Sequence, residues 1–483
     1  MTTHTEAVRK LLRLAVWTYR DNARVVGALR AQLTRLDEPL RVAIAGKVKA
    51  GKSTLLNALV GEAIAATDAG ECTRVVTWYR DGRSPRIMAY PKGGSPAPLP
   101  VVRRDGELRI DLGDTPASQL DRLVVDWPAR SLHAMTLIDT PGIASLSTDV
   151  SHRAVQFLGP SDDTPSEADA VIYLMRHLHV SDVDFLESFR DQGVARATAV
   201  NTVAVLSRAD EIGAGRLDAM VSARGIAARH RSEPALRGLC QNVVAVAGLL
   251  AHTGRTLRNA EYASLHALST LERPALDAAL LSTDRFLASD LAESSVDTRR
   301  SLLHRFGLFG IRLSTTLIRQ GASSPAALAT ELVDRSGLRD LQSVLHTQFS
   351  ERHDVLKARS ALLALQRILV TDSGRGLAGE VERLLTSTHD FTELRLLAAL
   401  RSGEIALPQP LSEEAERLLG DTGITAPARL GLPTNTPAHV LRSTALSTLQ
   451  RWRHHAENPI LSHRAANACR TIIKTCERIL NPR

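Results

Sequence analysis

One short segment limits the fold of this chain more than any other. Gly46-Lys-Val-Lys-Ala-Gly51-Lys52-Ser53 follows a β-branched run and precedes an apolar helical pattern. In the spacing G-x-x-x-x-G-K-S, backbone N–H groups close around phosphate oxygens, the lysine reaches the terminal phosphates and the serine hydroxyl can ligate Mg²⁺. A chance glycine-rich turn is the alternative, and the strand–loop–helix context argues against it. The segment predicts a nucleotide-binding loop made of Gly46, Lys47, Val48, Lys49, Ala50, Gly51, Lys52, Ser53 and Thr54.

The residues around this loop alternate between β-branched runs and helical patterns from Arg41 to about Gly248. Such alternation is typical of an α/β domain with a mostly parallel sheet and helices on both faces. The runs that we expect to form strands are Val42–Ala45, Val75–Tyr79, Ile87–Tyr90, Met135–Asp139, Ala170–Met175, Thr202–Leu206 and Val243–Ala247.

Helical patterns fill the chain beyond about Ala251. We therefore expect an α/β P-loop domain at 39–255, whose end falls between 255 and 335, and an all-α region at 256–483. The Pro/Gly-rich stretch 402–437 is the best loop candidate in this region. Residues 4–36 have the pattern of one long amphipathic helix, with an apolar stripe matching that of 460–480. Residues 1–38 are thus expected to pack with the C-terminal bundle, so that both chain ends build it.

Composition narrows the class of protein further. With 483 residues, 44% of them hydrophobic and 23% charged, the chain is neither disordered nor collagen-like. No apolar run approaches the ~20 residues that span a bilayer, and basic residues at 9, 10 and 13 break up any signal-peptide core. The cysteines are too scattered for a metal site or a disulfide framework and are expected as core thiols: Cys72, Cys240, Cys469 and Cys476. We expect a cytoplasmic protein of several domains.

A second motif, Asp139-Thr-Pro-Gly142, follows the run Met135–Ile138. An aspartate at the end of a strand beside the phosphate loop can hold Mg²⁺ through water. The Gly142 N–H can then meet the γ-phosphate. Ser53 and Asp139 are therefore the expected magnesium site.

A third motif indicates which base is bound. Ser207-Arg-Ala-Asp210 follows the strand pattern Thr202–Leu206 and matches the usual [NTS]-[KR]-x-D element. Asp210 can accept both guanine N1–H and N2–H, which adenine does not offer, and Arg208 would stack over the base. Ala247 and Gly248 would donate N–H groups to guanine O6. The expected substrate is GTP and the product GDP; an ordinary surface loop is the alternative.

A threonine between Ser53 and Asp139 is expected to complete the metal site. Thr73 precedes a strand at a suitable distance, and Thr67 is the rival. Either could instead be an ordinary turn residue.

In their order and in their residues these motifs resemble those of the translation-factor-related GTPases. The helical segments before and after them are similar to those of dynamin-like proteins. The stretches Ala43–Val60, Thr67–Arg80, Val205–Gly213 and Arg305–Arg312 resemble bacterial dynamin-like GTPases of the mycobacterial isoniazid-inducible group. The resemblance implies GTP hydrolysis with Mg²⁺, self-association through the GTPase domain and fission or fusion of membranes. It also implies a helical neck and trunk built from both chain ends, at 1–38 and 256–483, with 402–437 as the candidate tip loop. It further implies a peripheral position on the cytoplasmic membrane, contact with anionic lipid, and a related dynamin-like chain as a possible partner.

The phosphate loop departs from the dynamin pattern. Val48 and Lys49 stand where dynamins carry Gln and Ser, and position 143 is Ile where many small GTPases carry a water-orienting Gln. Slow hydrolysis without dimerisation or a partner is therefore expected. Lys49 could itself replace the monovalent cation of related enzymes, with Lys52, Thr73 and Gly142 as the other catalytic groups; the alternative is that Lys49 faces solvent or a partner domain.

The membrane-contact segment is weakly marked. Phe306, Leu308 and Phe309 form the most apolar aromatic segment of the helical half, and packing inside the core is their alternative role. The basic end at 440–483, with eight Lys/Arg against two Glu, could add attraction to anionic lipid.

Two other functions stay open: a ribosome- or RNA-associated GTPase, which the basic pI favours, and a GTP-switched scaffold with little turnover. Aromatic residues at 4% and the lack of a recognisable RNA-binding module argue against a nucleic-acid partner.

Overall fold

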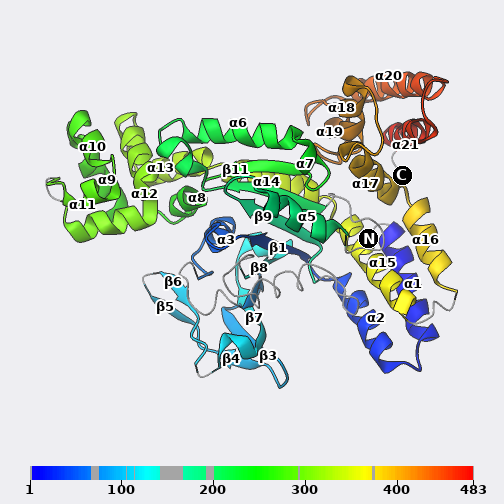
Figure 1. Cartoon of the computed structure of the whole chain (residues 1–483), viewed down its shortest axis with the longest axis horizontal. Helices are drawn as coiled ribbons and strands as arrows, with labels where there is room; N and C mark the ends of the chain where they lie inside the picture. Colours follow the sequence, from blue (N-terminus) through cyan, green and yellow to red (C-terminus); the bar gives the residue numbers. More distant parts are fainter. Residues whose placement is uncertain are drawn as a thin grey trace.

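The computed structural model describes residues 3–66, 75–104, 106–113, 115–141, 167–191, 201–291, 294–371 and 376–481. Within them a nine-stranded sheet has the order β11-β10-β9-β1-β8-β2-β7-β3-β4 (Figure 1). Its strands are β1 (Leu40–Gly46), β2 (Val76–Asp81), β3 (Arg86–Pro91), β4 (Ala97–Leu99), β7 (Leu120–Trp127), β8 (Met135–Asp139), β9 (Ala170–Met175), β10 (Thr202–Ser207) and β11 (Asn242–Val246). A separate hairpin pairs β5 (Val102–Arg104) with β6 (Glu107–Arg109).

The sheet is parallel where the nucleotide motifs lie. β1 pairs in parallel with β8 and β9, and β10 pairs in parallel with β9 and β11. β2 runs antiparallel to β8. It begins the other half of the sheet, which continues through β7 and β3 to β4. The mostly parallel sheet and the seven expected strands are confirmed; β4 and β7 contain none of the runs that we expected to form strands.

Both faces of the sheet are covered, because alternate residues of each strand point to opposite sides. Ala43 and Ala45 join one buried cluster, whereas Val42 and Ile44 join the other. The helices of this part of the chain are α3 (Lys52–Val60), α5 (Val180–Asp191), α6 (Ala219–Ser232), α7 (Pro234–Arg237), α8 (Gly248–Arg255), α9 (Asn259–Thr270), α10 (Arg273–Ala279), α11 (Thr283–Ala288), α12 (Val296–Arg319), α13 (Pro325–Arg335) and α14 (Leu338–Leu345). Of these, α9 to α13 lie to one side of the sheet and pack on α8 and on one another (Figure 1). Leu338, Leu341 and Leu345 of α14 belong to the second cluster, so the cover of the sheet extends past residue 335.

The segment expected to contact lipid lies inside this core. Phe306 and Phe309 of α12 are 1% and 4% exposed and join the first cluster, with Leu308 packed against it. Gly307 has a φ of +62° and interrupts the helix there. Arg312 donates to the carbonyl of Leu280 at 2.8 Å. The segment therefore serves packing, and these side chains are not available to a membrane in this conformation.

The N-terminal residues form a helical hairpin, so the expectation of one long helix is wrong. α1 (Thr3–Thr18) and α2 (Ala23–Arg35) are separated by a turn, and the Asn22 side chain caps α2 by accepting from the Val25 amide at 3.2 Å. The hairpin packs on α15 (His353–Thr371) and α16 (Ala378–Ser387). The buried Lys357 donates to the carbonyl of Leu36 at 2.7 Å and ties α15 to the end of α2.

A second helical unit holds the C-terminal part of the chain. It consists of α17 (His389–Arg401), α18 (Gln409–Leu418), α19 (Ala426–Leu430), α20 (Ala438–Ala456) and α21 (His463–Leu480). α21 packs on α20, α17 and α18 around a core of its own, not along the N-terminal hairpin as expected. The stretch 402–437, expected to be a tip loop, contains α18 and α19, and Leu418 and Leu430 are buried there.

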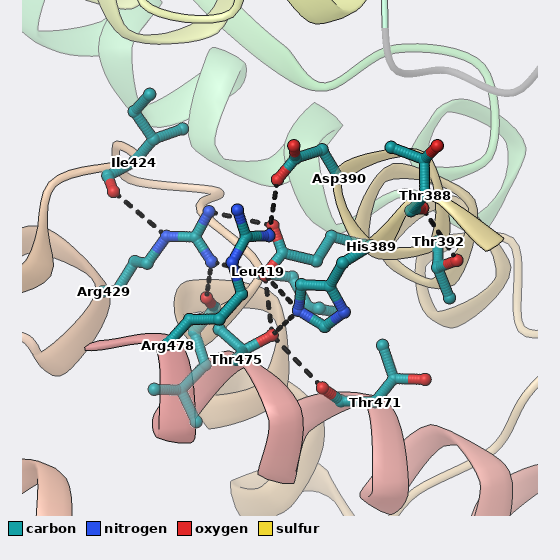
Figure 2. A network of polar contacts seen from close by, with 12 residues as sticks. Thr388, His389, Asp390, Thr392, Leu419, Ile424, Arg429, Thr471, Thr475 and Arg478 are labelled. Carbon is teal, nitrogen blue, oxygen red and sulfur yellow. Dashed lines mark hydrogen bonds and ion pairs between the residues drawn. The ribbon is translucent and has the colours of Figure 1, made fainter. Parts of the chain in front are cut away.

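A polar network joins three helices of this unit (Figure 2). Glu393 of α17 is 4% exposed and accepts two hydrogen bonds from Arg429, at 2.7 and 2.9 Å. The Thr475 hydroxyl of α21 donates to the same carboxylate at 2.6 Å. Asp390 accepts from Arg478 at 2.7 Å and lies 3.1 Å from the ring of His4 in α1. The network therefore ties α17 to α19, to α21 and to the start of the chain.

Among the described residues, no helix combines the length and the apolar character needed to cross a membrane. Cys240, Cys469 and Cys476 are free and buried, as expected of core thiols. Burial raises the pKa of the Cys240 thiol to about 11. Cys72 lies outside the described residues.

Candidate nucleotide-binding site

The predicted phosphate loop connects β1 to α3 at the carboxyl end of the parallel strands. Gly46 has a φ of +147°, and a Cβ there would lie 2.5 Å from the carbonyl oxygen of Leu174, so the loop leaves the sheet where only glycine fits. Gly51 has a φ of +92° and starts α3. The loop therefore turns its backbone back over the first turn of a helix, which is the arrangement that receives phosphate.

Lys52 lies over this loop. Its ammonium donates to the carbonyls of Gly46 and Lys47, at 3.2 and 3.3 Å. Burial lowers the pKa of Lys52, and the nearby Asp139 carboxylate opposes that shift. A cation held at this point faces the position of the terminal phosphates in such loops.

Ser53 and Asp139 come together from α3 and the end of β8. The Ser53 hydroxyl donates to one carboxylate oxygen of Asp139 at 2.8 Å. The other oxygen, Oδ1, is buried and has no hydrogen-bond partner among the residues that the structure describes, and burial raises the pKa of the group. A hydroxyl and a carboxylate are hard oxygen ligands of the kind Mg²⁺ prefers. This pair therefore fits the expected magnesium site.

The base-recognition motif lines a cavity that also reaches the phosphate loop. The cavity has a volume of about 160 Å³ and is bordered by Ala50, Gly51, Thr54, Ser207, Arg208, Asp210 and Gly248, among others. Arg208 has a φ of +51° and donates to Glu211 at 2.6 Å. Burial raises the pKa of Asp210. The phosphate loop and the base-recognition motif, which are far apart in the sequence, thus line the same cavity.

One expected base contact needs correction. The Ala247 N–H donates to the carbonyl of Ser336 at 2.9 Å, so this amide is engaged in joining β11 to the start of α14. Gly248 borders the cavity. Gly248 alone therefore remains as the expected N–H donor to guanine O6.

Several expected catalytic residues cannot be placed. Thr73, its rival Thr67 and Gly142 lie outside the described residues. Lys49 is exposed and has a φ of +62°, and its neighbour Val48 is 47% exposed. The third and fourth loop positions therefore project outward, away from the sheet.

The structure adds a contact that sequence reasoning missed. The Lys47 ammonium donates to Asp182 at 3.1 Å, and Asp182, at the start of α5, is 1% exposed. The other oxygen of Asp182 accepts from the Tyr173 hydroxyl of β9 at 2.8 Å. Burial raises the pKa of Tyr173, as do its hydrogen bond to Asp182 and the charge of that carboxylate. The clustering of three of the seven lysines at 47–52 was the available signal, but it did not name the partner.

Comparison with known proteins agrees with these features. The model of the Dynamin family matches residues 42–204. The chain is 42% identical to isoniazid-induced protein IniC of Mycobacterium tuberculosis (strain H37Rv), over 99% of this chain and 98% of that protein. It is also 30% identical to the bacterial dynamin-like protein of Nostoc punctiforme, over 28% of this chain and 20% of that protein.

Among solved structures, a match is described as "an oligomerised bacterial dynamin pair". It has a TM-score of 0.31 and 13% identity, and the alignment covers 94% of this chain and 61% of the other.

Proposed function

The chain belongs to the IniC-type bacterial dynamin-like proteins, a family of GTPases, and from this premise we propose that it uses GTP hydrolysis with Mg²⁺ to drive self-association and the remodelling of a membrane. The observation that carries the proposal is the meeting of the phosphate loop, the Ser53–Asp139 pair and Asp210 at one end of the parallel sheet. Each supplies one part of what a guanine nucleotide requires.

Binding begins at the two ends of the nucleotide. The amides at the start of α3 and the Lys52 ammonium receive the phosphates. Asp210, as a carboxylate, accepts the two guanine N–H donors, and Arg208 covers the base with its stem. Because adenine presents no such donor pair, the cavity favours GTP over ATP.

Ser53 would hold Mg²⁺ directly and Asp139 through water, and the ion would neutralise charge on the phosphates. The Lys52 ammonium stabilises negative charge that develops on the terminal phosphate. Thr73 and Gly142 remain proposed as the switch threonine and the γ-phosphate amide. Turnover is expected to be slow in isolated chains, since Val48 and Lys49 replace the usual Gln and Ser.

Self-association is proposed to use the GTPase domain. The exposed Val48 and Lys49 offer a contact that a second domain can complete. Residues 39–255, with the following helices to the end of α14 at Leu345, are proposed as the GTPase domain; 1–38 and 346–483 supply the neck and trunk. The protein is proposed to lie peripherally on the cytoplasmic membrane, on anionic lipid, with a related dynamin-like chain as a possible partner.

The test compares wild type and Lys52→Ala in two assays, GTP hydrolysis and the shape of anionic vesicles seen by electron microscopy. Wild type is expected to hydrolyse GTP and to deform vesicles with GTP but not with GDP. Lys52→Ala should do neither. Hydrolysis without any effect on vesicles, together with sedimentation on ribosomes, would favour the RNA-associated alternative; binding of GTP without turnover would favour the scaffold.

A further inference from the structure

The α1–α2 hairpin projects away from the sheet. α2 ends at Arg35, just before β1 begins at Leu40, so this end of the hairpin lies at the sheet. The α1–α2 turn is at the opposite end of the hairpin, away from the sheet (Figure 1). Lys357 of α15 binds the carbonyl of Leu36 near the sheet, so α15 also runs outward from there. The turn therefore lies at the end of the hairpin that is remote from the sheet, where a large flat partner can reach it.

One face of α1 is apolar and buried. Val8, Leu11, Leu12 and Ala15 are 0–6% exposed and pack against the rest of the bundle. The opposite face is different. Leu14 is 46% and Trp17 is 65% exposed, although both are large apolar side chains.

Basic side chains surround these two residues. Helical geometry places Lys10, Arg13, Leu14 and Trp17 on one side of α1. The Arg20 guanidinium lies 4.9 Å from the centre of the Trp17 ring. Between residues 10 and 24 the charged residues are Lys10, Arg13, Arg20 and Arg24 against Asp21, a net charge of +3.

We propose that this surface, which we call the Trp17 surface (Lys10, Arg13, Leu14, Trp17, Arg20 and Arg24), is where the chain contacts an anionic lipid bilayer. The inference rests on the proposed function and names the part of the molecule that carries it out. An indole beside an apolar side chain suits the boundary between headgroups and acyl chains. Each basic residue near an anionic membrane adds ~1 kcal/mol of attraction.

A second copy of the chain fits this surface less well. Two-fold pairing would set the same patch against itself and bring two net charges of +3 together. A stable interface also needs roughly 800 Å² from each partner, with a buried apolar centre. Two apolar side chains ringed by cations do not provide that, whereas a negatively charged lipid surface matches the charge.

The test uses the protein's own fluorescence. The other tryptophans, Trp78, Trp127 and Trp452, are 8%, 4% and 0% exposed, so a change of environment at the surface is reported by Trp17. The full chain is mixed with vesicles of phosphatidylglycerol and phosphatidylcholine, or of phosphatidylcholine alone. We expect the emission to shift to shorter wavelength, and brominated acyl chains to quench it, with the anionic vesicles only.

Variants test the same surface by sedimentation. Trp17→Ser and Leu14→Ser change exposed side chains, so the fold is expected to persist, which circular dichroism checks. Each should weaken binding to anionic vesicles by about fivefold to tenfold, since ~1–1.4 kcal/mol of apolar transfer is lost. Ile460→Ser is the matched control, because Ile460 is 90% exposed in the turn between α20 and α21, and it should bind as wild type does.

The outcomes separate the surface from the function. If wild type binds anionic vesicles while Trp17 emission and the two serine variants are unaffected, the Trp17 surface is overturned and the membrane function stands. If no vesicle binds wild type, both are overturned. If Trp17→Ser instead abolishes self-association in the absence of lipid, the surface is a protein interface and the inference is wrong.

Discussion

Lys47 and Asp182 form an ion pair of 3.1 Å that fastens the phosphate loop to the start of α5. The carbonyl of Lys47 also accepts from Lys52, so the pair holds a residue that positions the phosphate-binding lysine. We expect Lys47→Ala and Asp182→Asn each to weaken GDP binding, because the loop loses an anchor.

A double-mutant cycle measures this coupling. Contacting residues commonly interact by 0.5–3 kcal/mol, and we expect ~1 kcal/mol in the dissociation constant of a fluorescent GDP analogue. Asp184→Asn, at an exposed residue of the same helix, is the control. If the two substitutions change the free energy of GDP binding additively, the contact between Lys47 and Asp182 does not contribute to binding.

Lys49 provides a prediction about cations. The Lys49 side chain is exposed, and we propose that its ammonium turns toward the phosphates of bound GTP and takes the place of a monovalent cation there, so wild-type turnover should be similar in sodium and in potassium. Lys49→Asn should be slower and partly restored by potassium. Asn is chosen because it tolerates the positive φ that Lys49 adopts, which keeps the loop backbone comparable. Strong stimulation of the wild type by potassium would rule out this role.

Glu393 is expected to be important for stability. Burial opposes its ionisation, but the hydrogen bond from His389 and the charge of Arg429 hold its pKa at about 2. Glu393→Gln leaves Arg429 without its anionic partner in a buried network, which typically costs ~3 kcal/mol or more. Urea unfolding followed by circular dichroism should show the loss, with the exposed Glu382→Gln as control. A change below about 1 kcal/mol would contradict the importance of this network.

His252 predicts how stability depends on pH. Burial, aided by the charge of Arg305, lowers its pKa to about 4 from an ordinary value of 6.5. Between these values the unfolded chain binds more protons than the folded one, so stability falls as the pH drops from about 6.5 to about 4. The lost free energy is at most ~3 kcal/mol.

Thermal unfolding across this pH range checks the effect. His252→Gln should flatten the dependence, whereas His439→Gln, at an exposed residue of α20, should leave it as in wild type. Equal slopes for all three proteins would refute the assignment to His252.

The parallel half of the sheet and the phosphate loop could be predicted from sequence because their signals are local. β-branched runs mark the strands, and the Gly46–Ser53 spacing places the loop between β1 and α3. Contacts between distant segments left no such signal. Lys47 and Asp182 are 135 residues apart. The amide of Ala247 donates to the carbonyl of Ser336, which lies just before α14.

The helical half was harder to predict for the same reason. The apolar stripe of residues 4–36 continues through the turn, and only the capping Asn22 marks the break into two helices. An amphipathic stripe shows that a face is buried but not which helix covers it. α1 therefore packs on α15 rather than on α21.

The assignment of the cavity to guanine is tested most directly by kcat/KM for GTP, ATP and xanthosine triphosphate, in wild type and Asp210→Asn. A site that pairs with specific N–H donors rejects a base lacking them strongly, so wild type should prefer GTP over ATP by at least about 10²-fold. In Asp210→Asn, activity with GTP should fall and activity with xanthosine triphosphate should rise, because the amide NH₂ can donate to the xanthine C2 carbonyl. Equal activity of the wild type with GTP and ATP would contradict the assignment.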